Sequence, residues 1–252
     1  MNKSIGIVTA LPGEARALAG RCSRAKAGGF SHYRAVLKDG TGLVVVQSGM
    51  GMDNAFSAAR WLVKKGVAVL GCFGVSGGLD PALSIGDLVF ADAVFMEGDH
   101  GISPVWKKGE RDSEVTFSGS DVNDVAVRWG PIITVQKPVL NTVGKRALFE
   151  RTGTMAVDME TAAVANAANQ SGLPFFAVRA ICDPADVSVS ESLFQCVDPK
   201  GRPRFSYLFR LIIRKPLIIS HLLRMKKDFT AALSRAPHVL QCLSGLHIPP
   251  AP

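Results

Sequence analysis

The sequence predicts a three-layer α/β fold in which a central mixed, largely parallel β-sheet is flanked by helices, followed by a helical C-terminal extension. Three observations predict it. Short apolar runs without alternation indicate strands covered on both faces. Segments with helical spacing alternate with these runs, as in parallel α/β sheets. Basic residues gather in the last fifth of the chain, which sets that part apart from the rest.

The strands are expected where short apolar runs lie between turn residues. Ile5–Ala10 is such a run and stops at a Pro-Gly turn, so a buried strand and then a helix from about Glu14 are expected. Similar runs recur along the chain. They are Tyr33–Leu37, Leu43–Gln47, Val67–Phe73, Asp87–Phe95, Ile132–Val135, Met155–Val157 and Phe175–Ile181.

Helices are expected where apolar residues recur at helical spacing. Asn54–Lys65 has its apolar residues on one face and ends at Gly66. Another helix is expected from Asp158 to about Gln170. Residues 97–130 are polar and broken, and we expect loops with short elements there.

Composition favours one folded domain with an appendage. The chain has 252 residues, of which 47% are hydrophobic and 20% charged, so a sizeable core is expected and disorder is not. We divide it into a catalytic domain over 1–190 and a basic extension over 191–252. From residue 199 onward there are ten Lys/Arg and a single acid, Asp228. This asymmetry points to an anionic partner, with a solvated cationic surface as the alternative.

The cysteines and the longest apolar runs exclude several classes. Five cysteines without a C-x-x-C pair predict neither a disulfide framework nor a zinc site, and no motif predicts a cofactor or a metal ion. Cys72 and Cys182 lie in apolar runs and are expected in the core. A reducing cytoplasm fits this pattern. No apolar stretch reaches the ~20 residues of a membrane span, and Ile5–Leu11 indicates a strand, not a signal peptide.

Three acids follow predicted strands. Glu14 comes after the first strand and its turn, Glu160 opens the helix after the Met155–Val157 strand, and Asp183 follows the last strand. Ligands of open α/β sheets bind at the carboxyl ends of strands, so the three acids are expected in one crevice. The alternatives are that Glu14 and Glu160 only favour helix N-termini and that Asp183 only serves a turn before Pro184.

Paired carboxylates suit the cleavage of a glycosidic bond. One acid helps the leaving group and another activates water across an oxocarbenium-like transition state. A purine leaves poorly as an anion, so its N7 must accept a proton as the bond breaks. A positioned carboxylic acid can supply that proton.

Five segments of the chain stand out together: an opening strand with a glutamate turn, two glycine corners, a Val-Asp-Met-Glu segment and an Arg-Ala-Ile-x-Asp segment. They are Ile5–Glu14, Gln47–Gly51, Gly74–Leu79, Val157–Glu160 and Arg179–Asp183. In this order they resemble the nucleoside phosphorylase and nucleosidase superfamily, especially the methylthioadenosine/adenosylhomocysteine nucleosidases, in which the fourth segment is the ribose motif. The likeness covers about residues 4–188 and implies the phosphorylase/hydrolase-like fold and a homodimer.

The resemblance implies a role for each residue of the site. Glu14 would be the general base toward the attacking water, and Arg179 would help to hold that water or an anionic nucleophile. Met159 would pack under the ribose, and Glu160 would accept hydrogen bonds from its hydroxyls. Asp183 would serve the purine N7 and the 6-amino side.

The glycine corners add substrate contacts and a departure from the family pattern. Gly51, Gly74, Val75 and Ser76 would lie against the ligand, the glycines allowing close backbone approach. Gly51 belongs to no dinucleotide fingerprint. Val75 stands where these nucleosidases have serine, and related phosphorylases grip phosphate with that serine and with an arginine where this chain has Cys72. Water is therefore the expected nucleophile.

A second departure concerns the base. Pro138 replaces the aromatic residue that stacks on the purine in the family, and Val139 would make the backbone contact.

The extension carries apolar and basic residues at helical spacing. Basic amphipathic helices suit an anionic membrane surface, and packing of the apolar faces on the core is the alternative. With few aromatics and no groove-reading motif, nucleic acid is not expected. The apolar positions are Leu208, Leu211, Ile212, Leu222, Met225, Phe229 and Leu233, in predicted segments Tyr207–Ile213, Leu217–Leu223 and Phe229–Leu233.

Two segments resemble the hopanoid-associated branch of the superfamily, namely Arg179–Ala185 and the Val-Asp-Pro-x-Gly-Arg stretch at Val197–Arg202. The resemblance implies hydrolysis of adenosylhopane to adenine and ribosylhopane in hopanoid biosynthesis, by a cytoplasmic protein at the inner membrane face. Three alternatives stay open: a phosphorylase, a nucleosidase for small 5′-thioadenosines, and a nucleoside-binding module without activity.

Overall fold

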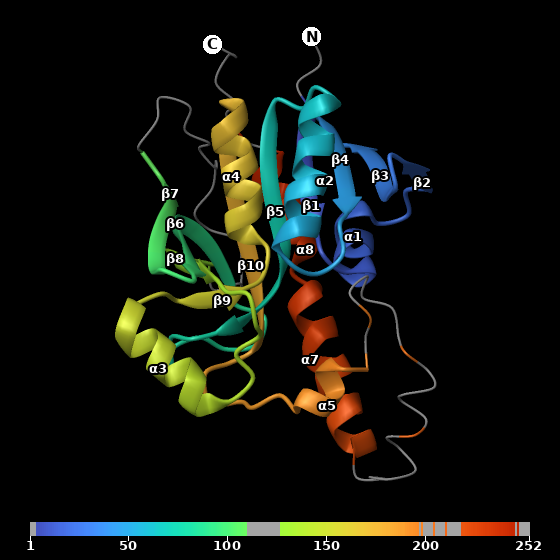
Figure 1. The fold of residues 1–252 in the computed structure, drawn as a ribbon. Helices are drawn as coiled ribbons and strands as arrows, with labels where there is room; N and C mark the ends of the chain where they lie inside the picture. Colours follow the sequence, from blue (N-terminus) through green and yellow to red (C-terminus); the bar gives the residue numbers. More distant parts are fainter. Residues whose placement is uncertain are drawn as a thin grey trace.

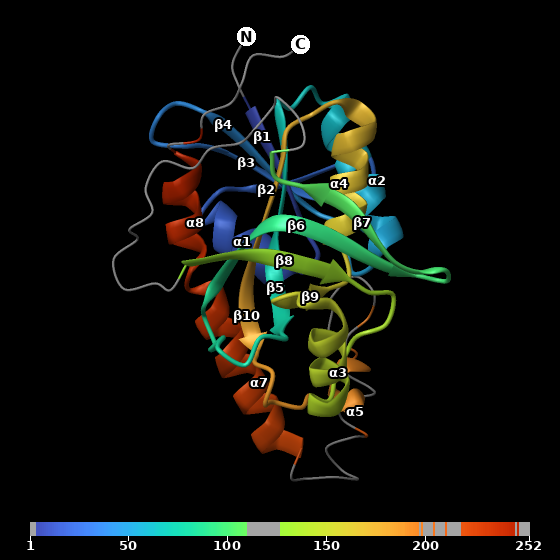
Figure 2. The same ribbon diagram turned by 90° about the vertical axis from the view of Figure 1, so that its left-hand side faces the viewer.

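The computed structural model describes residues 4–109, 127–196, 198, 204, 210, 218–244 and 246. Within them a ten-stranded mixed sheet lies between two layers of helices, which Figure 1 and Figure 2 show from perpendicular directions. The three-layer α/β fold expected from the sequence is confirmed, and the described part of the extension is helical.

The sheet is parallel at its centre, and antiparallel pairs join the outer strands β2, β3 and β7 to it. Strands β4, β1, β5 and β10 pair in this order, each parallel to the next. Strand β10 also pairs with β6, so β5, β10, β6, β8 and β9 close into a ring. The strands are β1 (Ser4–Thr9), β2 (Arg24–Ala27), β3 (Phe30–Val36), β4 (Gly42–Gln47), β5 (Val69–Gly78), β6 (Leu88–Gly98), β7 (Gly101–Lys107), β8 (Val127–Thr134), β9 (Ala156–Asp158) and β10 (Phe175–Asp183).

The helices form one layer on each face of the sheet. Figure 2 shows α2 and α4 on one side, and α1, α7 and α8 on the other. The helices are α1 (Pro12–Ala19), α2 (Met52–Lys64), α3 (Thr142–Thr152), α4 (Thr161–Ser171), α5 (Glu191–Phe194), α7 (Ile218–Leu233) and α8 (Ala236–Leu243). None of the described helices is long and apolar enough to cross a membrane.

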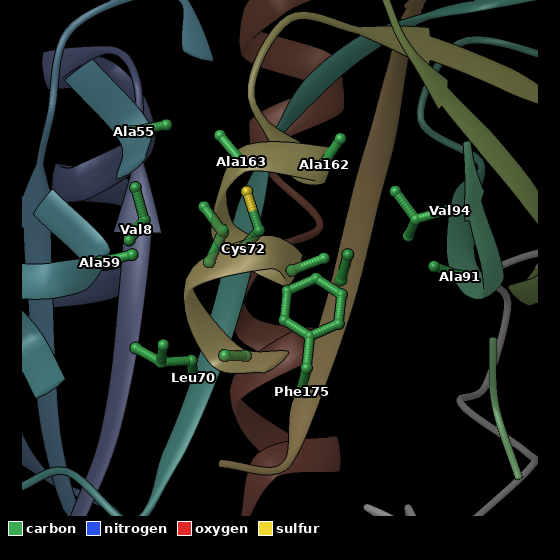
Figure 3. Close-up of a cluster of buried hydrophobic side chains, with 14 of the residues drawn as sticks. Val8, Ala55, Ala59, Leu70, Cys72, Ala91, Val94, Ala162, Ala163 and Phe175 are labelled. Carbon is green, nitrogen blue, oxygen red and sulfur yellow. The ribbon is translucent and has the colours of Figure 1, made fainter. Parts of the chain in front are cut away.

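Small side chains let α2 and α4 lie close to each other and to the sheet. Figure 3 shows Ala55 and Ala59 of α2, Ala162 and Ala163 of α4, and Cys72 of β5 in one buried cluster. Interiors are packed to the density of organic crystals, so alanines at these contacts set a short separation. The start of α4 is thereby held near the glycine-rich half of β5.

The C-terminal helices share the core on the opposite face. Ala232, Ala236, Val239, Cys242 and Leu243 are buried in one cluster with strands β1 and β5 and helix α1. Packing on the core, the alternative left open for the extension, is therefore found for α8 and the end of α7. Two predicted segments merge into α7, while Tyr207–Ile213 lies outside the described residues apart from position 210.

Three elements differ from expectation. Residues 97–130 were expected to be loops with short elements, but β6 runs on to Gly98 and β7 is a seven-residue strand paired with it. Strand β7 and the unpredicted β2 are edge strands whose positions are mostly exposed, and in both the apolar residues are interrupted by polar ones, so neither shows an apolar run. Helix α3 was also missed because it is weakly amphipathic, although Asn141 caps it and Gly153 ends it in the left-handed conformation.

Helix α7 abuts the turn that carries Glu14. A Cβ at Gly13 would lie 2.8 Å from Cε1 of Phe229 and 3.4 Å from Cδ1 of Leu233. We expect Gly13→Ala to lower the free energy of unfolding by about 1–3 kcal/mol, the usual cost of overpacking. Denaturant unfolding measures it. Combined with Phe229→Leu, the loss should be less than additive; strict additivity would contradict this contact.

Candidate active site

Glu14 is a buried carboxylate held by three backbone N–H groups. It stands at the third position of α1, and Oε2 accepts from Leu11 at 2.8 Å and from Ala10 at 2.9 Å. These contacts with the start of the helix are half of a capping box. Glu14 therefore does stabilise the N-terminus of α1, as the alternative interpretation expected. Oε1 accepts from Val75 N at 3.0 Å, which joins the α1 turn to β5.

Arg179 and Glu14 both lie against Gly74. Strands β5 and β10 place Arg179 beside Gly74 in register. A Cβ at Gly74 would lie 2.5 Å from Nη1 of Arg179 and 2.7 Å from Oε1 of Glu14. Only glycine leaves room for both side chains. Burial raises the pKa of Glu14, against the lowering by its backbone donors and Arg179, which suits a general base.

Asp158 pairs with the guanidinium of Arg179 and holds it in place. Arg179 is 1% exposed, and its Nη2 lies 2.5 Å from Oδ2 of Asp158. Nε and Nη2 of Arg179 also donate to Oγ1 of Thr161, at 3.0 and 2.8 Å, and Oδ1 of Asp158 accepts from Thr134 Oγ1 at 2.6 Å. Burial alone would lower the pKa of Arg179, but Asp158 and the other groups raise it, so the charge is permanent.

Glu160 joins the same cluster from the start of α4. It is the N-cap residue and not part of the first turn, and its Oε1 accepts from Gly51 N at 2.8 Å, while Oε2 lies 4.0 Å from Nη2 of Arg179. Gly51 has a φ of 93°, a conformation that favours glycine. Glu14, Arg179, Glu160 and Asp158 are called the Gly74 cluster below. Burial raises the pKa of Glu160 to about 7, with Asp158 adding to the effect and Arg179 opposing it.

The raised pKa of Glu160 predicts how the stability of the folded chain depends on pH. Because the folded chain holds the proton more tightly than the unfolded chain, the contribution of Glu160 is favourable below pH 4.5 and is lost as the pH rises through about 7. Glu160→Gln keeps an acceptor for Gly51 N and should therefore raise the melting temperature over wild type at pH 8 but not at pH 4.5. Equal shifts at both pH values would contradict the ionisation. Glu150→Gln, an exposed change, is the control.

Asp183 is the last residue of β10 and lies farther along β5. A Cβ at Gly77 would be 3.2 Å from its Oδ2. Gly77 lies three residues along the strand from Gly74, a distance of about 10 Å. Oδ2 of Asp183 pairs with Nζ of Lys145 at 2.8 Å. No sequence pattern pointed to Lys145, a single lysine on a polar helix.

Two cysteines that were expected only as core residues touch charged members of the site. Cys72 is buried and its Sγ accepts from Nη2 of Arg179 at 3.1 Å; burial raises its thiol pKa to about 12. Cys182 is only partly buried, and its Sγ donates to Oδ1 of Asp183 at 3.1 Å. Burial, and then Asp183, raise its pKa, so both sulfurs act as thiols.

The other residues that were predicted to contact the substrate lie along the same strands and loops. Met159 is half-buried between Asp158 and Glu160. Ser76 is buried on the strand after Val75, and its Oγ has no hydrogen-bond partner within the described chain. Pro138 and Val139 are half-buried and precede Leu140, whose carbonyl accepts from Val189 N beyond Asp183. The structure thus groups Glu14, Arg179, Glu160, Gly51, Gly74 and Val75. The backbone N–H groups of Val75 and Gly51 donate to the two glutamates, and Arg179 lies against Gly74 together with Glu14 and 4.0 Å from Glu160.

The geometry separates two chemical functions. At Gly74 a raised-pKa carboxylate stands beside a fixed cation, which can hold and deprotonate a small nucleophile. About 10 Å along β5, a second carboxyl group with a buried ammonium can exchange a proton with a leaving group. Across the residues that the structure describes, no three His, Cys, Asp or Glu gather as metal ligands.

Comparison with known proteins agrees with this arrangement. The model of the phosphorylase superfamily matches residues 4–214. A 5′-methylthioadenosine/S-adenosylhomocysteine nucleosidase of Staphylococcus aureus is 26% identical over 200 residues, which are 72% of this chain and 87% of the relative.

Solved structures share the fold. A nucleosidase of the same name from Colwellia psychrerythraea, in complex with adenine, matches with a TM-score of 0.69 at 18% identity, over all of this chain and 99% of the other. A futalosine hydrolase of Helicobacter pylori matches with a TM-score of 0.69 at 19% identity, over 96% and 98% of the two chains.

Proposed function

Because the chain belongs to the phosphorylase superfamily, we propose that it is a purine nucleosidase that hydrolyses the bond between ribose and adenine. The convergence of Glu14 and Arg179 over Gly74 carries this proposal. Glu14 takes a proton from water as its oxygen attacks C1′ of the ribose. The C1′–N9 bond breaks, and the purine accepts a proton at N7 from Asp183. Glu160 accepts hydrogen bonds from the ribose hydroxyls, with Met159 beneath the sugar.

Two substitutions favour water over phosphate as the nucleophile. The positions at which the resemblance predicts phosphate ligands hold Cys72 and Val75. Cys72 lies in the α2–α4 core with its sulfur against Arg179, and Val75 packs into the core cluster of the opposite face. Neither side chain can donate a strong hydrogen bond to an anion. The relatives named above as nucleosidase and hydrolase support the same choice.

For the 5′ group we propose a large apolar substituent, with adenosylhopane as the substrate that the branch resemblance implies. The position of α7 supports this, since its Phe229 lies against Gly13, next to Glu14. The helix also exposes apolar and basic residues together: Leu223 is 63% exposed, beside the exposed Lys226 and Lys227. Leu223 and these lysines line an open hollow on α7. Such a surface suits an anionic bilayer, from which a lipid-linked nucleoside would reach the site.

A substrate panel tests the activity. The purified protein is incubated with adenosine, 5′-methylthioadenosine and a 5′-deoxyadenosine that carries a long alkyl chain, each with and without phosphate. We expect adenine to be released at a rate that phosphate does not raise, with the highest kcat/KM for the long-chain substrate. Preference for 5′-methylthioadenosine would reject the lipid substrate, and dependence on phosphate would reject hydrolysis.

Vesicle flotation tests the membrane part separately. We expect the protein to float with phosphatidylglycerol vesicles and not with phosphatidylcholine vesicles. Reversing three charges on α7, Arg224, Lys226 and Lys227 to Glu, should abolish flotation. The matched control reverses Arg24, Lys26 and Lys38, which are exposed around the β2–β3 hairpin. Equal flotation of both triple variants would contradict a membrane-facing α7. The predicted homodimer is checked by sedimentation equilibrium.

A further inference from the structure

Lys145 is fully buried and surrounded by acceptors. Its Nζ lies 2.8 Å from Oδ2 of Asp183, and it donates to the carbonyl oxygens of Asp183 and Pro184 at 2.8 Å and of Val187 at 2.9 Å. A buried charge is costly unless it is paired and hydrogen-bonded. Four acceptors surround a group with three N–H donors, so every N–H of an ammonium can find an acceptor. This position is therefore built for a cation, and not for apolar packing.

The two carboxylate oxygens of Asp183 are left in different surroundings. Oδ2 faces the ammonium of Lys145, whereas Oδ1 has the thiol of Cys182 at 3.1 Å as its donor. A thiol is a weak donor, so Oδ1 is the oxygen that can take a stronger partner. The carbonyl contacts also tie the backbone from Asp183 to Val187 to helix α3, which fixes the direction of the carboxyl group.

We propose that Lys145 is a positioning residue for the departure of the purine, an inference that rests on the proposed nucleosidase function. Asp183 first takes a proton from solvent on Oδ1, the oxygen that has only a weak thiol donor. When this proton passes to N7, the C1′–N9 bond breaks and its electron pair moves into the purine ring. Asp183 is left as a carboxylate. Lys145 stabilises that charge as it forms, through Oδ2, and needs no movement to do so.

The test compares two leaving groups on one sugar. Adenine leaves from 5′-methylthioadenosine with a proton, whereas 4-nitrophenolate leaves as a stable anion from the matching 5-methylthio-β-ribofuranoside. Lys145→Met should lower kcat/KM for adenine release ~100-fold, the order of a positioned acid. The variant should lower kcat/KM for release of nitrophenolate no more than about 3-fold, because this leaving group needs no proton from Asp183. A merely structural lysine would affect both substrates alike.

Two further variants make the result decisive. Arg146→Met removes the neighbouring, exposed cation of α3 and should leave both rates unchanged. The double variant Lys145→Met/Asp183→Asn leaves no unpaired buried charge, so it keeps the test open if the single variant does not fold. It should lose no more activity than Asp183→Asn alone.

The outcomes separate this inference from the function it rests on. Equal losses on both substrates, or full additivity in the double variant, would overturn the role of Lys145. Failure of the nucleosidase function would appear in the unaltered protein, which would then release no adenine at all.

Discussion

Asp183→Asn is expected to lower kcat for adenine release by ~10²–10⁴-fold, the range for loss of a positioned acid. Asn has nearly the same shape but no acidic proton for N7. Its amide oxygen can still accept from Lys145, and the backbone contacts of Lys145 do not depend on the side chain. The fold should therefore persist, with a circular dichroism spectrum like that of wild type.

Asp186→Asn is the matched control, since Asp186 is an exposed carboxylate three residues along the same segment. Its activity should equal that of wild type. Near-normal adenine release by Asp183→Asn, measured under the same conditions, would refute the acid role. A loss confined to KM would instead assign Asp183 to binding.

Gly74→Ala is expected to abolish activity by displacing both catalytic side chains at once. Its Cβ would collide with Nη1 of Arg179 at 2.5 Å and Oε1 of Glu14 at 2.7 Å, and both groups are held by other hydrogen bonds. A misplacement of about 1 Å can cost about 100-fold in rate. Moving the buried Glu14 also leaves backbone donors unpaired, so a loss of about 1–3 kcal/mol in stability is expected.

Gly98→Ala on β6 is the control, because a Cβ there meets nothing within 4 Å. Steady-state kinetics and denaturant unfolding of the two variants give the comparison. If Gly74→Ala retained more than a tenth of wild-type kcat/KM, which is a loss of less than about 1.4 kcal/mol in transition-state stabilisation, the convergence of Glu14 and Arg179 would not matter for the reaction.

The fold was predictable wherever the core imposes a pattern on the chain. The buried strands of the sheet centre appear as apolar runs, and α2 appears as a periodic helix. The edge strands β2 and β7 do not, because their side chains meet water on most positions. Helix α3 does not either, since it buries little apart from Leu148 and a charged residue, Lys145.

The candidate site was predictable to the extent that it lies at strand ends. Strand ends and motifs pointed to Glu14, Glu160 and Asp183, and the structure connects the first two through Arg179. The residues that hold these side chains in place were not predictable. Asp158 belongs to the ribose motif, but no pattern showed that it pairs with Arg179. Lys145 lies 38 positions before its partner Asp183. Contacts of that length depend on the tertiary fold and leave no local spacing to detect.

The most direct test of whether the Gly74 cluster activates water is to follow the oxygen atom from water into the sugar product. The purified protein is given its preferred 5′-substituted adenosine in H₂¹⁸O without phosphate. The sugar product is reduced with borohydride at once, before its anomeric oxygen exchanges with water, and is then analysed by mass spectrometry. We predict one ¹⁸O at C1 of the 5-substituted ribose for each adenine released. Adenine release that occurs only with phosphate, with ribose 1-phosphate as the sugar product, would contradict it.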